Sequence, residues 1–121
     1  MRLFRSRNLL DEEECWKLWI APEGSLPKTI KRFNAEGKLN PRTGRPFSPS
    51  GIEKAALRWA IKNPVEARRD LETKLYSWGE TITDDDWHQY LYDAVKTAHK
   101  TEPRKIERLV NRLGLQKYAN S

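Results

Sequence analysis

Apolar residues recur three and four positions apart through most of the chain, which is the spacing of one face of an α-helix. The pattern is cleanest near the C-terminus. Between residues 84 and 98 it places Trp87, Leu91 and Val95 on one side, and between 103 and 113 it groups Ile106 with Leu109. The pattern is helical almost throughout, so we predict a mainly α fold.

Residues that favour helix ends divide this pattern into segments. Side chains able to cap a helix N-terminus stand before most of them, and proline or glycine follows at the expected places. The predicted caps are Asp11, Ser25, Ser48, Asn63 and Thr83, and the predicted helix stops include Gly37, Gly79 and Gly114.

Composition favours one small domain over residues 1–121 with a modest core. Tryptophan is expected to fill much of that core, because each indole buries a large area. The five tryptophans are Trp16, Trp19, Trp59, Trp78 and Trp87. A single cysteine, Cys15, excludes an internal disulfide and leaves no zinc-ligand set, so we predict no metal and no cofactor. Without a long apolar run or a signal-peptide pattern, we expect a cytoplasmic protein with no membrane span.

The net charge of +6 is concentrated in one part of the sequence. Residues 28–62 contain nine basic and two acidic residues, whereas residues 1–27 and 63–121 are close to neutral. A segregated basic patch attracts a polyanion and gains affinity by releasing counterions. We therefore predict a nucleic acid as the partner, with double-stranded DNA as the first candidate. An ordinary solvated basic surface is the alternative.

The basic segment has the order of a helix-turn-helix at about residues 25–62: a helix, a connector rich in proline and glycine, and a serine-capped helix. The start of such a second helix reads bases in the major groove, and its free N–H groups donate hydrogen bonds to phosphates. Lysine and arginine one and two turns later can reach a base or a phosphate, and arginines on the connector can reach the backbone or a minor groove. The predicted DNA-binding residues are Lys28, Lys31, Lys38, Arg42, Arg45, Ser48, Ser50, Lys54 and Arg58. The predicted core of the fold is accordingly a helix-turn-helix or winged helix.

Residues 29–57, TIKRFNAEGKLNPRTGRPFSPSGIEKAAL, carry a motif that resembles the helix-turn-helix segment of the large serine recombinases and related phage or mobile-element proteins. That segment reads as a helix ending in L-N-x-x-G, a P-R-G-G-x-W connector, and S-x-S-T-V before the next helix. Lys38 stands where the family has an apolar residue, and Phe47 matches the aromatic position but replaces its usual tryptophan. The matching residues are Asn34, Gly37, Pro41, Arg42, Gly44, Arg45, Phe47, Ser48, Ser50 and Ile52. The resemblance implies a DNA-reading module. It does not extend to the catalytic domain, so recombinase activity is not implied.

Several features have more than one interpretation. The 28–62 segment can also be two core helices joined by a proline-rich turn. The acidic run at 11–14 suits a solvated helix start, but it can also bind a basic partner or shield the DNA face by an intramolecular contact. The predicted helix at 102–113 carries a basic face that suits either a second DNA contact or a homodimer. That face contains Arg104, Lys105, Arg108 and Arg112.

No catalytic motif is present in the sequence, so we predict no enzyme. Cys15 lies among acidic residues, which oppose thiolate formation, and is expected to be a buried structural thiol. The leading hypothesis is a sequence-specific DNA-binding protein, acting as a transcriptional regulator or as an accessory factor of a phage or mobile element. The competing hypothesis is a protein-interaction module that binds and modulates a polymerase or another enzyme.

Overall fold

The computed structural model describes residues 11–20, 24–39 and 44–119, and these ranges are mainly helical with no β-strand among them. The mainly α prediction is confirmed. None of the described helices is long and apolar enough to cross a membrane. The elements in order are α2 (Glu12–Cys15), the π-helical turn η1 (Trp16–Ile20), α3 (Leu26–Ala35), α4 (Pro49–Lys62), α5 (Pro64–Ser77), α6 (Asp84–Ala98), α7 (Pro103–Arg112) and α8 (Gln116–Ala119).

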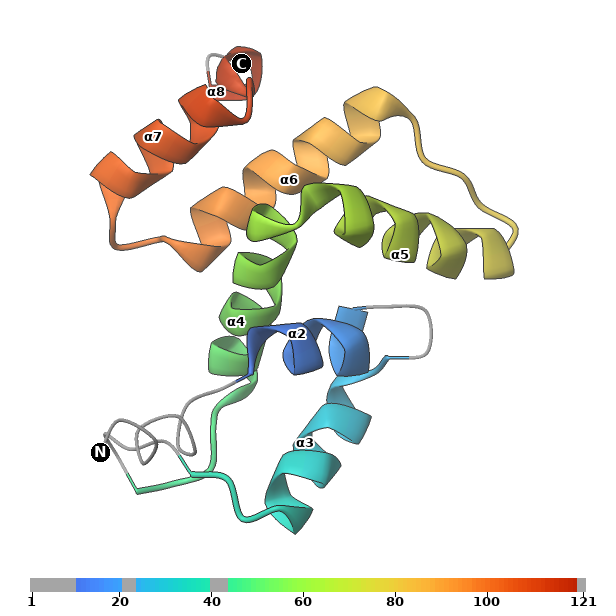
Figure 1. The fold of residues 1–121 in the computed structure, drawn as a ribbon, viewed down its shortest axis with the longest axis vertical. Coiled ribbons are helices and arrows are strands. Elements are labelled where there is room, and N and C mark those ends of the chain that lie inside the picture. The colour runs from blue at the N-terminus through green and yellow to red at the C-terminus, as the bar shows by residue number, and fades with distance from the viewer. Residues whose placement is uncertain (1–10, 21–23, 40–43, 120–121) are drawn as a thin grey trace.

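Helix α4 is the centre of the fold (Figure 1). The Ser48 side chain accepts a hydrogen bond from the Gly51 N–H and Pro49 occupies the first turn, so the helix begins where the sequence predicts. Its alanines allow neighbouring helices to approach closely, with α2 and η1 packing on one part of α4 and α6 on another. The buried residues of α4 are Ile52, Ala55, Ala56, Leu57, Trp59, Ala60 and Ile61.

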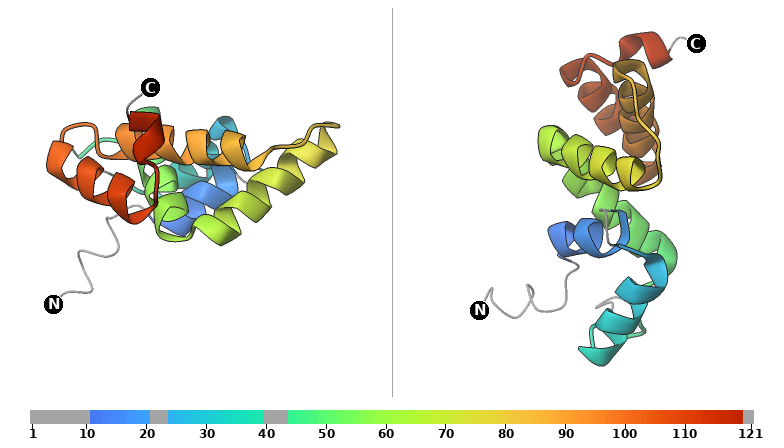
Figure 2. Two further views of the ribbon diagram at one scale, coloured as in Figure 1. Left: turned by 90° about the horizontal axis from the view of Figure 1, so that it is seen from above. Right: turned by 90° about the vertical axis from the view of Figure 1, so that its right-hand side faces the viewer.

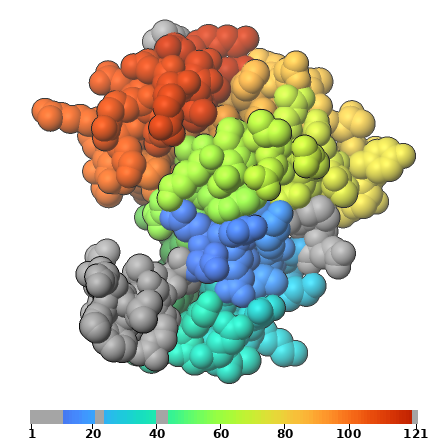
Figure 3. Space-filling view, viewed as in Figure 1, coloured from blue at the N-terminus to red at the C-terminus, as the bar shows by residue number. Residues whose placement is uncertain are grey.

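The segment α2–η1 is anchored by two fully buried side chains, Cys15 and Trp16. The Trp16 ring stacks on Trp59 of α4 at a centroid distance of 5.9 Å. Its indole Nε1 also donates a hydrogen bond of 2.8 Å to Asp70 of α5. In the space-filling view this segment lies between α3 and α5 (Figure 3). The sequence predicts only a short α-helix here, whereas the chain widens into a π-helical turn after Cys15.

Helix α5 is the least buried of the long helices, with Ala67 as its one buried residue. Polar contacts hold it instead, among them the Lys74 Nζ, which donates to the Ile20 carbonyl oxygen at 3.1 Å. The sequence predicts that tryptophans fill much of the core, but Trp78 is 63% exposed and is not part of it. Trp78 follows the end of α5, where its ring centroid lies 5.6 Å from the Lys74 Nζ.

Helices α6 and α7 lie at the end of the molecule opposite α3 (Figure 2). Thr83 caps the start of α6, as the sequence predicts. Asp86 completes a reciprocal capping box with it, because its side chain accepts from the Thr83 N–H. Helix α7 packs on α6, and the Leu115 N–H donates to the Val110 carbonyl oxygen at 2.9 Å, which confirms the predicted ending at Gly114.

The link between α4 and α5 corrects one sequence prediction. Helix α5 does begin at Pro64, but Asn63 makes no side-chain cap. Its Nδ2 donates to the Trp59 carbonyl oxygen at 3.0 Å and so closes α4 instead. The finer prediction of a helix-turn-helix or winged-helix core stays a prediction: α3 packs mainly on η1, and α4 packs on α2, η1, α5 and α6.

Candidate nucleic-acid interface

Helices α4 and α7 both pack on α6 and leave a groove of about 340 Å³ between them. The amphipathic sequence of α7 positions one side of this groove. Leu109 and Val110 are buried, which leaves the basic residues of α7 directed away from that apolar face. We call this the α4–α7 groove, and it is lined by Arg58, Ile61, Lys62, His99, Lys105, Arg108, Leu109 and Arg112.

The electrostatics of the groove are dominated by five cationic side chains, two from α4 and three from α7. The Glu102 carboxylate beside it responds to this charge. A hydrogen bond with the His99 ring lowers the pKa of Glu102, and the positive charges of Lys105 and Arg58 lower it further. The lowered pKa of Glu102 thus reflects its hydrogen bond with His99 first, and the nearby groove cations add to the effect.

One carboxylate of the chain already lies against the α4 side of the groove. Asp11 caps α2 by accepting a hydrogen bond from the Glu14 N–H, and Glu12 then lies in the first turn of that helix. One Glu12 oxygen is 3.1 Å from the Arg58 Nε, and the other is 2.9 Å from the Lys62 Nζ. Both α4 cations of the groove are thus paired within the chain.

A second acidic residue of α2 pairs with the end of α3. The Glu14 carboxylate is 2.9 Å from the Lys38 Nζ and 3.3 Å from the Arg32 guanidinium. Burial alone would lower the pKa of Lys38, but hydrogen bonds and charges from Glu14 and Glu36 outweigh it and raise that pKa. Of the interpretations that the sequence leaves open for the acidic run, the structure shows the intramolecular contact with the basic segment. Lys38 consequently faces its own chain and is mostly shielded from solvent.

The structure distributes the predicted DNA-binding residues over separate places. Lys28 and Lys31 are exposed on α3, which lies at the opposite end of the molecule from α7 (Figures 1 and 2). Arg42 lies outside the described residues. The remaining predicted residues are Arg45, Ser48 and Ser50, which are exposed, and Lys54 and Arg58, which are half-buried. Among the predicted residues that the structure describes, only Arg58 lines the α4–α7 groove.

The other four basic residues of the groove are outside the predicted set of binding residues: Lys62, Lys105, Arg108 and Arg112. The three from α7 belong to the basic face for which the sequence leaves open a second DNA contact or a homodimer. Their signals are present in the sequence. Lys62 continues the i, i+4 spacing of Lys54 and Arg58, and the three α7 residues lie opposite an apolar face. What the sequence lacks is the information that α6 brings these two stripes together.

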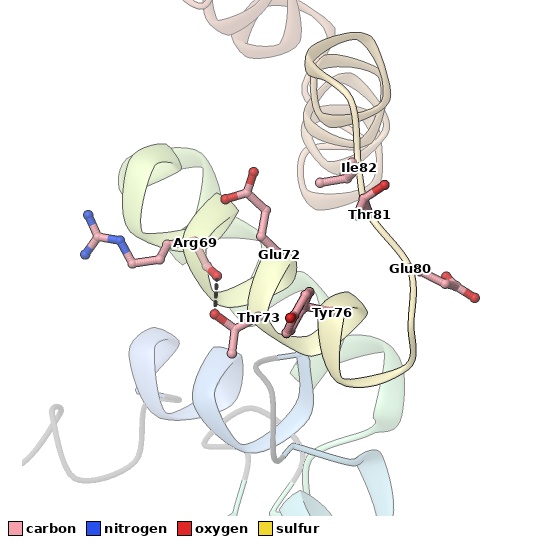
Figure 4. Close-up of a pocket in the computed structure, with 7 residues that line it drawn as sticks. All are labelled: Arg69, Glu72, Thr73, Tyr76, Glu80, Thr81 and Ile82. Carbon is pink, nitrogen blue, oxygen red and sulfur yellow. Dashed lines mark hydrogen bonds between the residues drawn. The ribbon is translucent and has the colours of Figure 1, made fainter.

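A second hollow, of about 360 Å³, lies between α5 and the segment 80–82 (Figure 4). Tyr76 stands between the two walls, and Thr73 donates a hydrogen bond to the Arg69 carbonyl oxygen at 2.9 Å. Its lining includes Arg69, Glu72 and Glu80. Because these charges are mixed, this hollow has no preference for a polyanion comparable with that of the α4–α7 groove.

Nucleophilic and metal-binding groups are not gathered in the described part of the chain. Burial raises the pKa of the Cys15 thiol to about 12, and the nearby Glu14 charge adds to the effect, so the buried thiol is protonated at neutral pH. Within residues 11–20, 24–39 and 44–119, no three His, Cys, Asp or Glu side chains are close enough to hold a metal ion.

Comparison with known protein families, with curated proteins and with solved structures finds no match to this chain. The functional inference therefore rests on the chemistry of the groove itself.

Proposed function

We propose that the protein binds duplex DNA through its phosphate backbone in the α4–α7 groove. The observation that supports this most strongly is the convergence of five cationic side chains from two helices on one groove. Neutralising phosphates with lysine and arginine releases counterions, which supplies most of the affinity of such contacts. Arginine adds paired hydrogen bonds to phosphate oxygens.

The spacing of the α7 cations suits this ligand. Lys105, Arg108 and Arg112 follow at i, i+3 and i+7, so they lie along one side of the helix. At a rise of about 1.5 Å per residue the stripe is about 10 Å long. One strand of B-DNA carries a phosphate for every ~3.4 Å of helix axis, so the stripe can follow about three consecutive phosphates.

In this proposal Arg58 and Lys62 contact phosphates, and the residues that read bases lie in the first two turns of α4. These are Ser50, which is exposed, and Lys54, which is half-buried and lies one turn before Arg58. A sequence-specific role as a transcriptional regulator or as an accessory factor of a phage or mobile element rests on the helix-turn-helix motif of the sequence. Its test is Lys54→Ala, which should cost about 1–3 kcal/mol on a selected site and little on a scrambled duplex.

The binding experiment is fluorescence anisotropy with a labelled random duplex of about 20 base pairs. Arg108→Gln should weaken binding about five- to tenfold near 0.1 M salt, because it removes one phosphate contact. Arg69→Gln is the matched control, since Arg69 is an exposed arginine on α5 outside the groove. Equal affinity for the two variants would show that the groove does not contact DNA.

A protein-interaction module is the second candidate function, because two large aromatic side chains are exposed near the end of α5. Tyr76 is 78% exposed and Trp78 is 63% exposed, and exposed aromatic residues are typical of protein interfaces. The test is binding to a purified RNA polymerase, with the wild type compared to the Tyr76→Ser/Trp78→Ser variant. A loss of polymerase binding with unchanged DNA binding would favour this function.

A further inference from the structure

We propose that Arg58 and Lys62 form a phosphate subsite of the α4–α7 groove and that the Glu12 carboxylate occupies this subsite until DNA displaces it. This inference rests on the proposed DNA-binding function and adds to it a specific ligand position and an internal competitor. Glu12 then sets the affinity of the protein for DNA without contacting the DNA.

The geometry of the ion pairs identifies the subsite. Arg58 and Lys62 lie one helical turn apart on α4, and each is within hydrogen-bond distance of a different oxygen of the same carboxylate, at 3.1 and 2.9 Å. A phosphodiester group likewise presents two unesterified oxygens that share a negative charge. The two cations are therefore already arranged for a two-oxygen anion.

The groove has one occupied side and one open side. On the α4 side, both cations are paired with Glu12. On the α7 side, Lys105, Arg108 and Arg112 form no ion pair with any residue that the structure describes. We expect a DNA backbone to be attracted first to the α7 cations and then to compete with Glu12 for the α4 pair.

Displacement needs the movement of one side chain and not of the helix. The adjacent residues Cys15 and Trp16 are fully buried and hold α2–η1 against α4. In contrast, the side chains of Arg58 and Lys62 are 35% and 63% exposed. The Glu12 side chain is 27% exposed, so both ion pairs are partly open to water. Water screens and weakens such pairs, so a phosphate can compete with the carboxylate for the two cations.

The test is a double-mutant cycle on duplex affinity, again by anisotropy with a random duplex. Glu12→Gln keeps the size of the side chain and frees the two cations. Two partly exposed ion pairs of this kind together correspond to about a fivefold change in an equilibrium constant, so Glu12→Gln should bind about fivefold more tightly than the wild type. In the Arg58→Gln/Lys62→Gln background the same substitution should give no such gain, because the subsite is gone.

Glu13→Gln is the matched control. Glu13 lies on the same helix, is exposed, forms no ion pair with the described residues, and its substitution changes the net charge by the same amount. It should tighten binding less than twofold in both backgrounds. A thermal melt of each variant within a few degrees of its parent would show that affinity, and not folding, has changed.

Three results would overturn the proposal, and they are distinguishable. Equal gains for Glu12→Gln and Glu13→Gln would mean that only net charge matters. A gain for Glu12→Gln that persists without Arg58 and Lys62 would place the competition elsewhere. Wild-type protein and Glu12→Gln that both fail to bind the duplex would refute the DNA-binding function itself, and the subsite with it.

Discussion

Replacing Trp59 with alanine tests whether α4 is the central core helix. Trp59 is 8% exposed and stacks on Trp16 with an angle of 28° between the ring planes. A buried indole removes roughly 150–250 Å² from water, which at ~25 cal/mol per Å² corresponds to about 4–6 kcal/mol. Core substitutions of this kind cost about 3–5 kcal/mol in practice, a large part of the ~5–15 kcal/mol that stabilises a small domain. We therefore expect the melting temperature to fall by roughly 10–20 °C.

Trp78→Ala is the control for this experiment, because Trp78 is the same residue type at a 63% exposed position. It should change the free energy of unfolding by about 0.5 kcal/mol or less. The assay is thermal and urea unfolding of both variants, followed by circular dichroism. If Trp59→Ala and Trp78→Ala melt at the same temperature, α4 is oriented differently and the position of its basic residues must be revised.

Three further predictions concern single groups. The Cys15 thiol, with its pKa raised to about 12 by burial, should react with iodoacetamide at pH 8 only as fast as the protein unfolds, and rapid labelling of folded protein would contradict this. Thr83→Ala removes the oxygen that accepts from the Asp86 N–H and should cost about 0.5–2 kcal/mol in urea unfolding, whereas the neighbouring exposed Thr81→Ala should have little effect. A hydrogen bond and the charge of the Arg68 guanidinium lower the pKa of Asp84 from 3.8, so this carboxylate stabilises the fold above about pH 4, and the stabilisation is lost as the pH falls through its lower folded value. Melting temperatures from pH 6 to pH 3 should therefore fall less steeply for Asp84→Asn than for the wild type, and parallel profiles would contradict the pKa shift.

Helix positions could be predicted from the sequence because their signals are local. The side chains of Ser25, Ser48 and Thr83 each accept the hydrogen bond that their position before a helix predicts. Asn63 shows the limit of such signals. It stands between two helices, and its side chain closes the first of them instead of capping the second. Local spacing does not decide between these two partners.

The charge pattern of the sequence does not show where the basic residues lie in space, and the tertiary structure is needed to place them. Residues 28–62 hold the positive excess. Glu12 lies 46 residues before Arg58 in the chain, yet its carboxylate pairs with Arg58 in the folded protein. The opposite happens near the C-terminus, where residues 63–121 are neutral overall but α7 presents its cations to the groove. Net charge by segment therefore predicted the kind of ligand, while the packing of α6 against α4 and α7 determines the place that we propose for it.

The salt dependence of duplex binding decides whether the α4–α7 groove contacts phosphates. The logarithm of the association constant should fall linearly with the logarithm of the salt concentration, with a slope of about −0.9 for each phosphate contact. For the Lys105→Gln/Arg108→Gln/Arg112→Gln variant we expect a slope that is flatter than that of the wild type by about two to three. Wild-type and variant proteins that share one slope would contradict the proposed interface.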